Sequence, residues 1–149
     1  MFHSHRWMGM LLVAAGLQLP ACRSSSPGKV EKARPAQIEH IEGSELSRVI
    51  LTEKAAERLD IATVPVREVL VKRTGALRRV VPYGAVLYDA RGETWVYTSP
   101  ETRTFVRHPI GVDFIDGEEA VLSDGPPSGT LVVTVGAAEL FGTEFEIGH

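Results

Sequence analysis

Short apolar runs alternate with clusters of Gly, Pro, Asp and Ser between residues 80 and 142, and this alternation constrains the fold more than any other feature of the sequence. The runs recur at about the 8–12-residue spacing that is typical of an all-β domain. The strongest local signal is Asp116-Gly117, which lies between the apolar residues of 110–114 and 120–122 and suits the positive φ of a two-residue type I′ turn. The sequence therefore predicts a β-hairpin around Asp116-Gly117.

Further strands are predicted on both sides of this hairpin. The apolar residues of the run 81–87 occupy alternate positions, as they do in a half-buried strand. We expect this run to form a hairpin with residues 94–97, which are β-branched and aromatic. The run 130–135 is apolar on both faces at its centre, which predicts a strand inside the sheet rather than at its edge.

The N-terminal half contributes a second group of elements. Residues 47–51 favour a short strand, Thr52 suits the N-cap of a short helix that ends near Asp60, and residues 61–66 favour another strand. Residues 137–142 are compatible with a last turn of helix. The predicted fold is mainly β, a small β-roll or barrel with one short α-helix.

The order of these segments carries a resemblance to a known family. The succession VPYGAVLYD, TWVYT, FVRHPIGV, AVL and GPPSGTLVVTVGAAELFG resembles the membrane-proximal domain of periplasmic adaptor subunits, or membrane fusion proteins, of resistance-nodulation-division efflux pumps. The stretch VILTEKAAERLDIATVPV is similar to the N-terminal part of the same domain. The resemblance implies one permuted SH3-like β-roll over residues 44–149.

The chain departs from that family between the two matching stretches. In full-length adaptors a β-barrel domain, a lipoyl-like domain and a helical hairpin separate the halves of the membrane-proximal domain, whereas here only residues 67–79 separate them. The resemblance therefore implies a membrane-proximal domain without the segments that contact an outer-membrane channel, and it leaves independent adaptor activity in doubt.

Residues 1–21 have the order of regions found in a secretory signal peptide, with a cationic head, an apolar core and a small residue before a cysteine. The apolar core is shorter than the roughly 20 residues needed to span a bilayer. The segment Leu19-Pro20-Ala21-Cys22 resembles a bacterial lipobox, from which Pro20 departs, and the resemblance implies a covalent lipid on Cys22. Cys22 is the only cysteine, so an internal disulfide is excluded.

These features predict a lipoprotein of the cell envelope that faces the periplasm. Arg23 follows the cysteine, as in lipoproteins sent to the outer membrane, whereas adaptors are more often at the inner membrane, so both membranes remain open. Residues 22–43 lack a sustained apolar period and are rich in Ser, Pro and charge, which predicts a flexible tether. A single domain over residues 44–149 is expected to follow.

The segment 67–79 is a candidate partner surface because it carries five cations and one acid, Glu68. The cations are Arg67, Lys72, Arg73, Arg78 and Arg79. They could dock on an acidic partner or on anionic lipid. Alternatively, they belong to a solvated strand pair whose charges prevent association between sheets.

The aromatic residues offer a second candidate surface. We expect Trp95 to lie in the core of the small domain. Tyr88 and Tyr97 could lie either in this core or on a docking surface, because buried tyrosines anchor many interfaces.

Catalytic and metal chemistry is not predicted. His40, His108 and His149 are too far apart in sequence for a local metal site, and a zinc site lacks a second cysteine. All three methionines precede Cys22, so a mature chain could not reproduce the thioether site of the similar copper- and silver-exporting adaptors. We therefore expect no enzyme and no cofactor apart from the lipid. The net charge of −3 argues against a nucleic-acid partner.

Two functional hypotheses follow. The first is a non-catalytic lipoprotein that binds a resistance-nodulation-division pump or a full-length adaptor at the membrane and serves transmembrane transport. The second is a free-standing extracytoplasmic lipoprotein that binds a small ligand or a metal. A remnant without any partner is a third possibility that the sequence leaves open.

Overall fold

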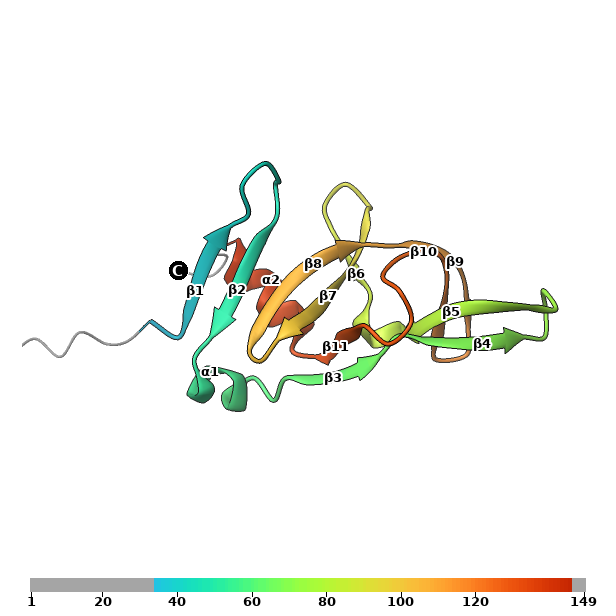
Figure 1. The fold of residues 1–149 in the computed structure, drawn as a ribbon, viewed down its shortest axis with the longest axis horizontal. Coiled ribbons are helices and arrows are strands. Elements are labelled where there is room, and N and C mark those ends of the chain that lie inside the picture. The colour runs from blue at the N-terminus through green and yellow to red at the C-terminus, as the bar shows by residue number, and fades with distance from the viewer. Residues whose placement is uncertain (1–33, 146–149) are drawn as a thin grey trace, which may run out of the picture. The chain divides into compact units, whose positions relative to one another are not determined.

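The computed structural model describes residues 34–145. The predicted signal peptide, the predicted lipid site Cys22 and the first part of the predicted tether lie outside these residues. Eleven strands in the described part form two antiparallel sheets, accompanied by two α-helices and one 3-10 helix (Figure 1). The prediction of a mainly β fold is confirmed.

The larger sheet, here called sheet A, joins the two halves of the chain. Its order is β1 (Ala36–His40), β2 (Ser47–Leu51), β8 (Thr104–Pro109), β7 (Thr94–Glu101), β11 (Leu131–Val135) and β3 (Ala62–Pro65), and β6 (Leu87–Tyr88) pairs with β7. Val49 of β2 lies opposite Phe105 of β8, and Val64 of β3 lies opposite Val132 of β11. The strand β11 lies between β7 and β3, which confirms its predicted place inside the sheet.

Two helices close one face of sheet A. The helix α1 (Glu53–Arg58) begins as predicted, because the Thr52 side chain accepts a hydrogen bond from the backbone N–H of Ala55. The helix α2 (Ala137–Glu144) is longer than the single turn expected, and it places Leu140 fully inside the core. Gly136 precedes α2 with a φ of 84°, in the left-handed region.

The smaller sheet, here called sheet B, contains the segment that joins the two halves. Its order is β4 (Arg67–Val71), β5 (Ala76–Pro82), β10 (Glu119–Asp124) and β9 (Gly111–Asp116). A buried apolar cluster joins the two sheets: Val96 and Val132 come from sheet A, while Val81, Ala120 and Leu122 come from sheet B. The joining segment is therefore a β-hairpin anchored at its base by a shared core.

The predicted hairpin of residues 81–87 with 94–97 is only partly correct. The strand β5 ends at Pro82, and the next residues form the 3-10 helix η1 (Tyr83–Ala85), in which the Val86 N–H donates to the Tyr83 carbonyl. Gly84 lies beside β11, where an added Cβ would be 3.8 Å from the Thr134 carbonyl oxygen. Only Leu87 and Tyr88 of this run pair with β7.

Two further predictions are wrong in detail. The predicted tether overlaps β1, in which Ile38 pairs with Val49 of β2. The turn between β9 and β10 consists of Gly117 and Glu118, and only Gly117 has a positive φ, of 63°. This is the pattern of a type II′ turn rather than type I′.

Candidate functional site

The outer part of the β4–β5 hairpin has only two strands. Residues 80–82 of β5 pair with β10, whereas residues 76–79 pair only with β4. Leu70 and Leu77 lie directly opposite each other there and are 65% and 66% exposed. Figure 1 shows this hairpin extending past the strands β9 and β10. The outer part of the hairpin therefore presents apolar side chains to solvent.

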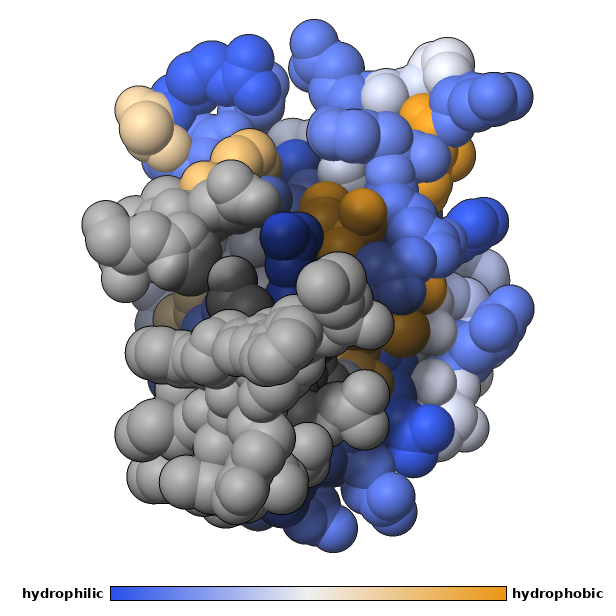
Figure 2. All heavy atoms as spheres, turned by 90° about the vertical axis from the view of Figure 1, so that its left-hand side faces the viewer, coloured by the Kyte–Doolittle hydropathy of each residue, from blue (hydrophilic) through white to orange (hydrophobic). Residues whose placement is uncertain are grey.

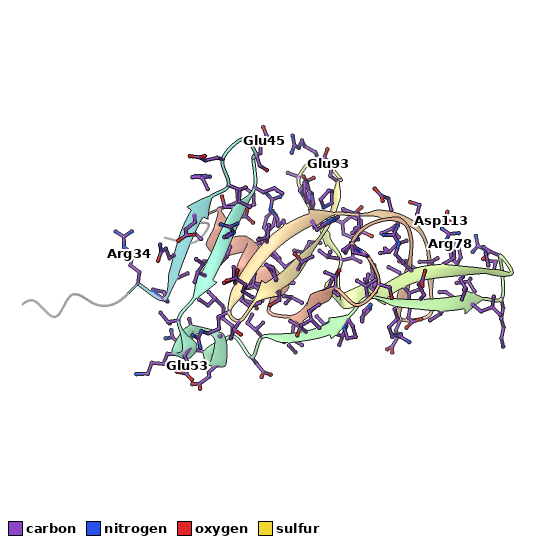
Figure 3. All side chains as sticks on the ribbon, viewed as in Figure 1. Arg34, Glu45, Glu53, Arg78, Glu93 and Asp113 are labelled. Atoms are coloured by element: carbon purple, nitrogen blue, oxygen red, sulfur yellow. The ribbon has the colours of Figure 1, made fainter. Side chains whose placement is uncertain are left out.

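Three of the predicted partner-surface arginines bind other parts of the protein instead. Arg67 forms an ion pair with Glu119 of β10. Arg78 donates to the Asp113 carboxylate at 2.9 Å and to the Leu122 carbonyl at 3.1 Å. Arg78 and Asp113 lie side by side in Figure 3. These contacts hold β4 and β5 against β9 and β10.

Arg79 has the same structural role on the loop that follows β10. Its guanidinium donates to the carbonyl oxygens of Gly125 and Pro126, the second at 3.1 Å, and lies 3.8 Å from the Asp124 carboxylate. Arg67, Arg78 and Arg79 are therefore paired within the domain, and their part in a partner surface stays a prediction.

Lys72 and Arg73, at the turn of the hairpin, keep their charges available. The Arg73 guanidinium lies 3.9 Å from the centre of the Phe114 ring, a cation–π contact that leaves its charge unneutralised. Neither residue forms an ion pair with an acid in residues 34–145. Gly75 completes the turn with a φ of 65°.

Tyr97 belongs to a buried polar cluster and not to an exposed surface. Its hydroxyl donates to the Glu144 carboxylate at 2.5 Å, and the same oxygen, Oε2, accepts from Arg107 Nε at 2.8 Å. Burial, followed by the hydrogen bond to Glu144, raises the pKa of Tyr97 well above its usual range. The prediction of Tyr97 as a possible partner contact is wrong, and its function is to bind the end of α2 to sheet A.

Aromatic rings surround the charged members of this cluster. The Arg107 guanidinium lies 4.6 Å from the centre of the Trp95 ring, 4.7 Å from that of Phe145 and 5.9 Å from that of Phe141. Trp95, expected in the core, is half-buried and covers this cation. Neither Arg107 nor Glu144 was singled out from the sequence, because nothing local indicates that residues 37 positions apart meet.

Tyr88 remains on the surface beside Tyr83. Both side chains are about half exposed, at 55% and 46%. A hydrogen bond with Tyr83 is the main cause that raises the pKa of Tyr88, followed by its partial burial. Tyr88 of the predicted surface is therefore exposed, and Tyr83, which the sequence did not single out, lies exposed beside it.

The comparison with known proteins does not identify the chain. No protein-family model matches it, and no curated protein matches it. Residues 34–145 also contain no group of three His, Cys, Asp or Glu side chains placed to hold a metal ion. Within the same residues, no helix is both long and apolar enough to cross a bilayer.

An open groove of about 480 Å³ lies between the β1–β2 loop and the β6–β7 turn. Trp95 and Ile110 contribute apolar surface to it, while Glu45 and Glu93 extend from the two neighbouring loops (Figure 3). Arg91 also lines the groove and lies 3.2 Å from the Glu93 carboxylate.

The side of the domain that carries β1 is mainly polar. Where described side chains are visible in Figure 2, hydrophilic ones predominate and hydrophobic ones form small groups between them. Leu70 and Leu77 of the β4–β5 hairpin have the largest exposed fractions among the exposed large hydrophobic side chains of residues 34–145.

Proposed function

We propose that the protein is a non-catalytic, membrane-anchored lipoprotein of the periplasmic-adaptor type, which acts as an interaction module in transmembrane transport. In this proposal Cys22 carries the lipid, and the domain binds a resistance-nodulation-division pump or a full-length adaptor. The observation that carries the proposal is the pairing of the two sequence-distant halves within sheet A.

This pairing supports the proposal because the two halves are the two stretches that resemble the adaptor domain. Arg48 to Ile50 of β2 pair with Thr104 to Val106 of β8, and β3 pairs with β11 along most of its length. The joining segment turns back within 13 residues as a hairpin, so the two halves pair in sheet A without the other adaptor domains. A shared sheet is what a membrane-proximal domain with a shortened insertion requires.

The proposal assigns protein contact to the exposed tyrosines Tyr83 and Tyr88. Half-exposed aromatic side chains supply large contact area at low cost in conformational entropy, and they commonly anchor interfaces. The buried polar groups of the domain are already paired with one another: no buried side-chain nitrogen or oxygen in the described residues lacks a hydrogen-bond partner. The groups that remain free to bind a partner therefore lie on the surface.

A crosslinking pull-down from native membranes tests this function. The full chain is compared with a Cys22→Ser variant and with a Tyr83→Ser/Tyr88→Ser variant. We expect Cys22→Ser to lose palmitate labelling, and the tyrosine variant to keep its palmitate but capture less of the pump or adaptor. Wild-type protein that captures neither a pump nor an adaptor would refute the proposal.

The groove beside Trp95 supports a second candidate, a small-ligand-binding lipoprotein. A ligand that binds only the folded state raises the melting temperature, and above Kd this rise grows with the logarithm of the ligand concentration. A thermal-shift screen with cationic pump substrates should then give a rise that Trp95→Ala reduces and Tyr88→Ser does not. Equal melting temperatures at all ligand concentrations would remove this candidate.

A further inference from the structure

The two faces of the β4–β5 hairpin differ in what covers them. Val71 and Val80 point to one face, where they pack with Val121 and are no more than 4% exposed. Leu70 and Leu77 occupy the alternate positions of the same strands, so they point to the other face. That second face is apolar near the turn but has nothing packed on it in the described domain.

Positive charge lies at the turn beside this leucine pair, where Lys72 is the available cation, because the Arg73 guanidinium packs on the Phe114 ring of the covered face. Residues 69–79 contain four cations and no acid. Arg78 and Arg79 bind acids and carbonyl groups of neighbouring strands, whereas Lys72 and Arg73 at the turn have no ion pair in residues 34–145. The chain has a net charge of −3, whereas this tip is locally positive. Its partner should therefore combine negative charge with an apolar interior.

The shape of the tip distinguishes between a protein and a membrane as that partner. A stable protein interface buries about 800 Å² on each partner, which two leucines on a two-stranded ribbon cannot supply. Two strands are only about 5 Å apart, so such a ribbon can enter the headgroup layer, where amphipathic segments bury their apolar side to a depth of about 5–10 Å. The tip is narrow, apolar and cationic, as such insertion requires.

We propose that the tip of the β4–β5 hairpin inserts Leu70 and Leu77 into an anionic phospholipid surface, with Lys72 at the lipid phosphates. This contact belongs to the folded domain and needs neither an acyl chain on Cys22 nor a pump. It goes beyond the proposed function, and it would orient the domain on whichever anionic membrane lies within reach.

Flotation with lipid vesicles tests the proposal on the full chain carrying Cys22→Ser, so that no lipid is attached. Vesicles of phosphatidylcholine alone are compared with vesicles of three parts phosphatidylcholine to one part phosphatidylglycerol. We expect binding to the anionic vesicles to fall at least tenfold in Leu70→Ser/Leu77→Ser. Each cation near an anionic surface contributes about fivefold in affinity, so Lys72→Glu should cost more than fivefold.

Matched variants separate the tip from the rest of the chain. Leu131→Ser changes an exposed leucine of sheet A, and Lys54→Glu reverses an exposed charge on α1. Both should bind the anionic vesicles like the parent chain. The apolar segment of residues 8–19 is the same in every variant, so it cannot cause the differences. Unchanged far-UV circular dichroism shows that each variant is folded.

A fluorescent label gives an independent measure of insertion. Because Cys22 is the only cysteine, Thr74→Cys in the Cys22→Ser chain is a unique labelling site at the turn. An environment-sensitive dye there should shift to shorter wavelength with anionic vesicles, and Leu70→Ser/Leu77→Ser should abolish the shift.

Three results would overturn the proposal: binding that does not depend on phosphatidylglycerol, binding equal in tip and control variants, or a dye that stays in water. Capture of an acidic protein by a crosslinker at residue 74, without vesicle binding, would replace the membrane with a protein partner. None of these results depends on lipidation or on a pump. The proposed function could therefore fail while this contact holds, and the reverse is equally possible.

Discussion

Arginine has opposite environments in the two sheets. In sheet A, Arg107 and Glu144 form an ion pair whose side chains are 7% and 3% exposed, and aromatic rings surround the guanidinium. In sheet B, Arg78 and Asp113 form a pair of similar length whose side chains are 24% and 45% exposed. Because the two distances are alike, we expect burial rather than distance to decide how much the fold depends on each ion pair.

The physical reason is the hydration of the ions. Removing one partner of a buried pair leaves an uncompensated charge, which costs far more than the pair itself contributes. An exposed ion that loses its partner is solvated by water again, so its loss costs little. Sheet A is therefore expected to be rigid around α2, whereas sheet B should tolerate changes of charge. Such tolerance suits a surface that contacts an external partner.

The largest effect is expected for Glu144→Ala, which leaves Arg107 and the Tyr97 hydroxyl buried without an acceptor. We expect the free energy of unfolding to fall by about 3–5 kcal/mol, measured by urea denaturation. The double variant Arg107→Met/Glu144→Leu should recover part of the loss, because no buried charge remains although the Tyr97 hydroxyl still lacks its acceptor. A fall below about 1 kcal/mol for Glu144→Ala would show that the buried pair behaves like an exposed one.

Tyr97→Phe should have an intermediate effect. It removes one hydrogen bond to the Glu144 carboxylate but leaves the Arg107 contact in place. Hydrogen bonds to charged groups contribute about 1.5–3 kcal/mol, so a loss in this range is expected in the same denaturation experiment. Trp95→Phe is the matched control, because it keeps an aromatic ring over Arg107. A tyrosine variant as stable as wild type would indicate that the hydroxyl is not bonded to Glu144.

The exposed pair of sheet B should show a small coupling. In a double-mutant cycle of Arg78→Ala and Asp113→Ala, we expect a coupling energy of about 0.2–1 kcal/mol that decreases from low to high salt. The single change Arg78→Ala also loses the bond to the Leu122 carbonyl, which the cycle subtracts. A coupling above about 3 kcal/mol would contradict the comparison between the two sheets.

Local signals in the sequence predicted the parts of the fold whose cause is local. Thr52 indicated the start of α1, and the apolar run 130–135 indicated an internal strand, because capping and two-sided burial leave a mark within a few residues. The strand β1 was missed, since Ala36–His40 has little apolar character and is held by pairing with β2. Strands of this kind depend on a neighbour that the sequence alone does not place.

The candidate site was predicted less well than the fold, and the reason is long-range pairing. The cations of residues 67–79 were recognised, but three of them meet partners 35–52 residues away, such as Glu119 for Arg67 and Asp113 for Arg78. Leu70 and Leu77 were not predicted as surface residues. Residues 69–71 are nevertheless apolar on both faces, a pattern that needs two covering layers. This apolar run is the sequence feature that could have predicted an uncovered face of the hairpin.

The smallest effect is expected for the pH dependence of stability that comes from Asp89, in the β6–β7 turn. Partial burial of Asp89 alone would raise its pKa. Hydrogen bonds from the Glu93 and Arg91 backbone N–H groups and from the Trp95 indole, together with the Arg91 charge, outweigh it and lower the pKa. A carboxyl with a lowered pKa in the folded state stabilises the fold above its unfolded pKa of about 3.9, and this contribution is lost as the pH falls through the folded value.

The wild type should therefore be more stable than Asp89→Asn at pH 6. The difference should be smaller than that of any change at Glu144, because the Asp89 side chain is 11% exposed and the Glu144 side chain only 3%. The difference should shrink as the pH falls below about 4, because a protonated aspartate resembles asparagine in charge. Urea denaturation of both proteins between pH 6 and pH 3 measures it. A difference that grows on acidification would mean that Asp89 is held in its neutral form, and the turn would then resemble the buried cluster of sheet A rather than the exposed pairs of sheet B.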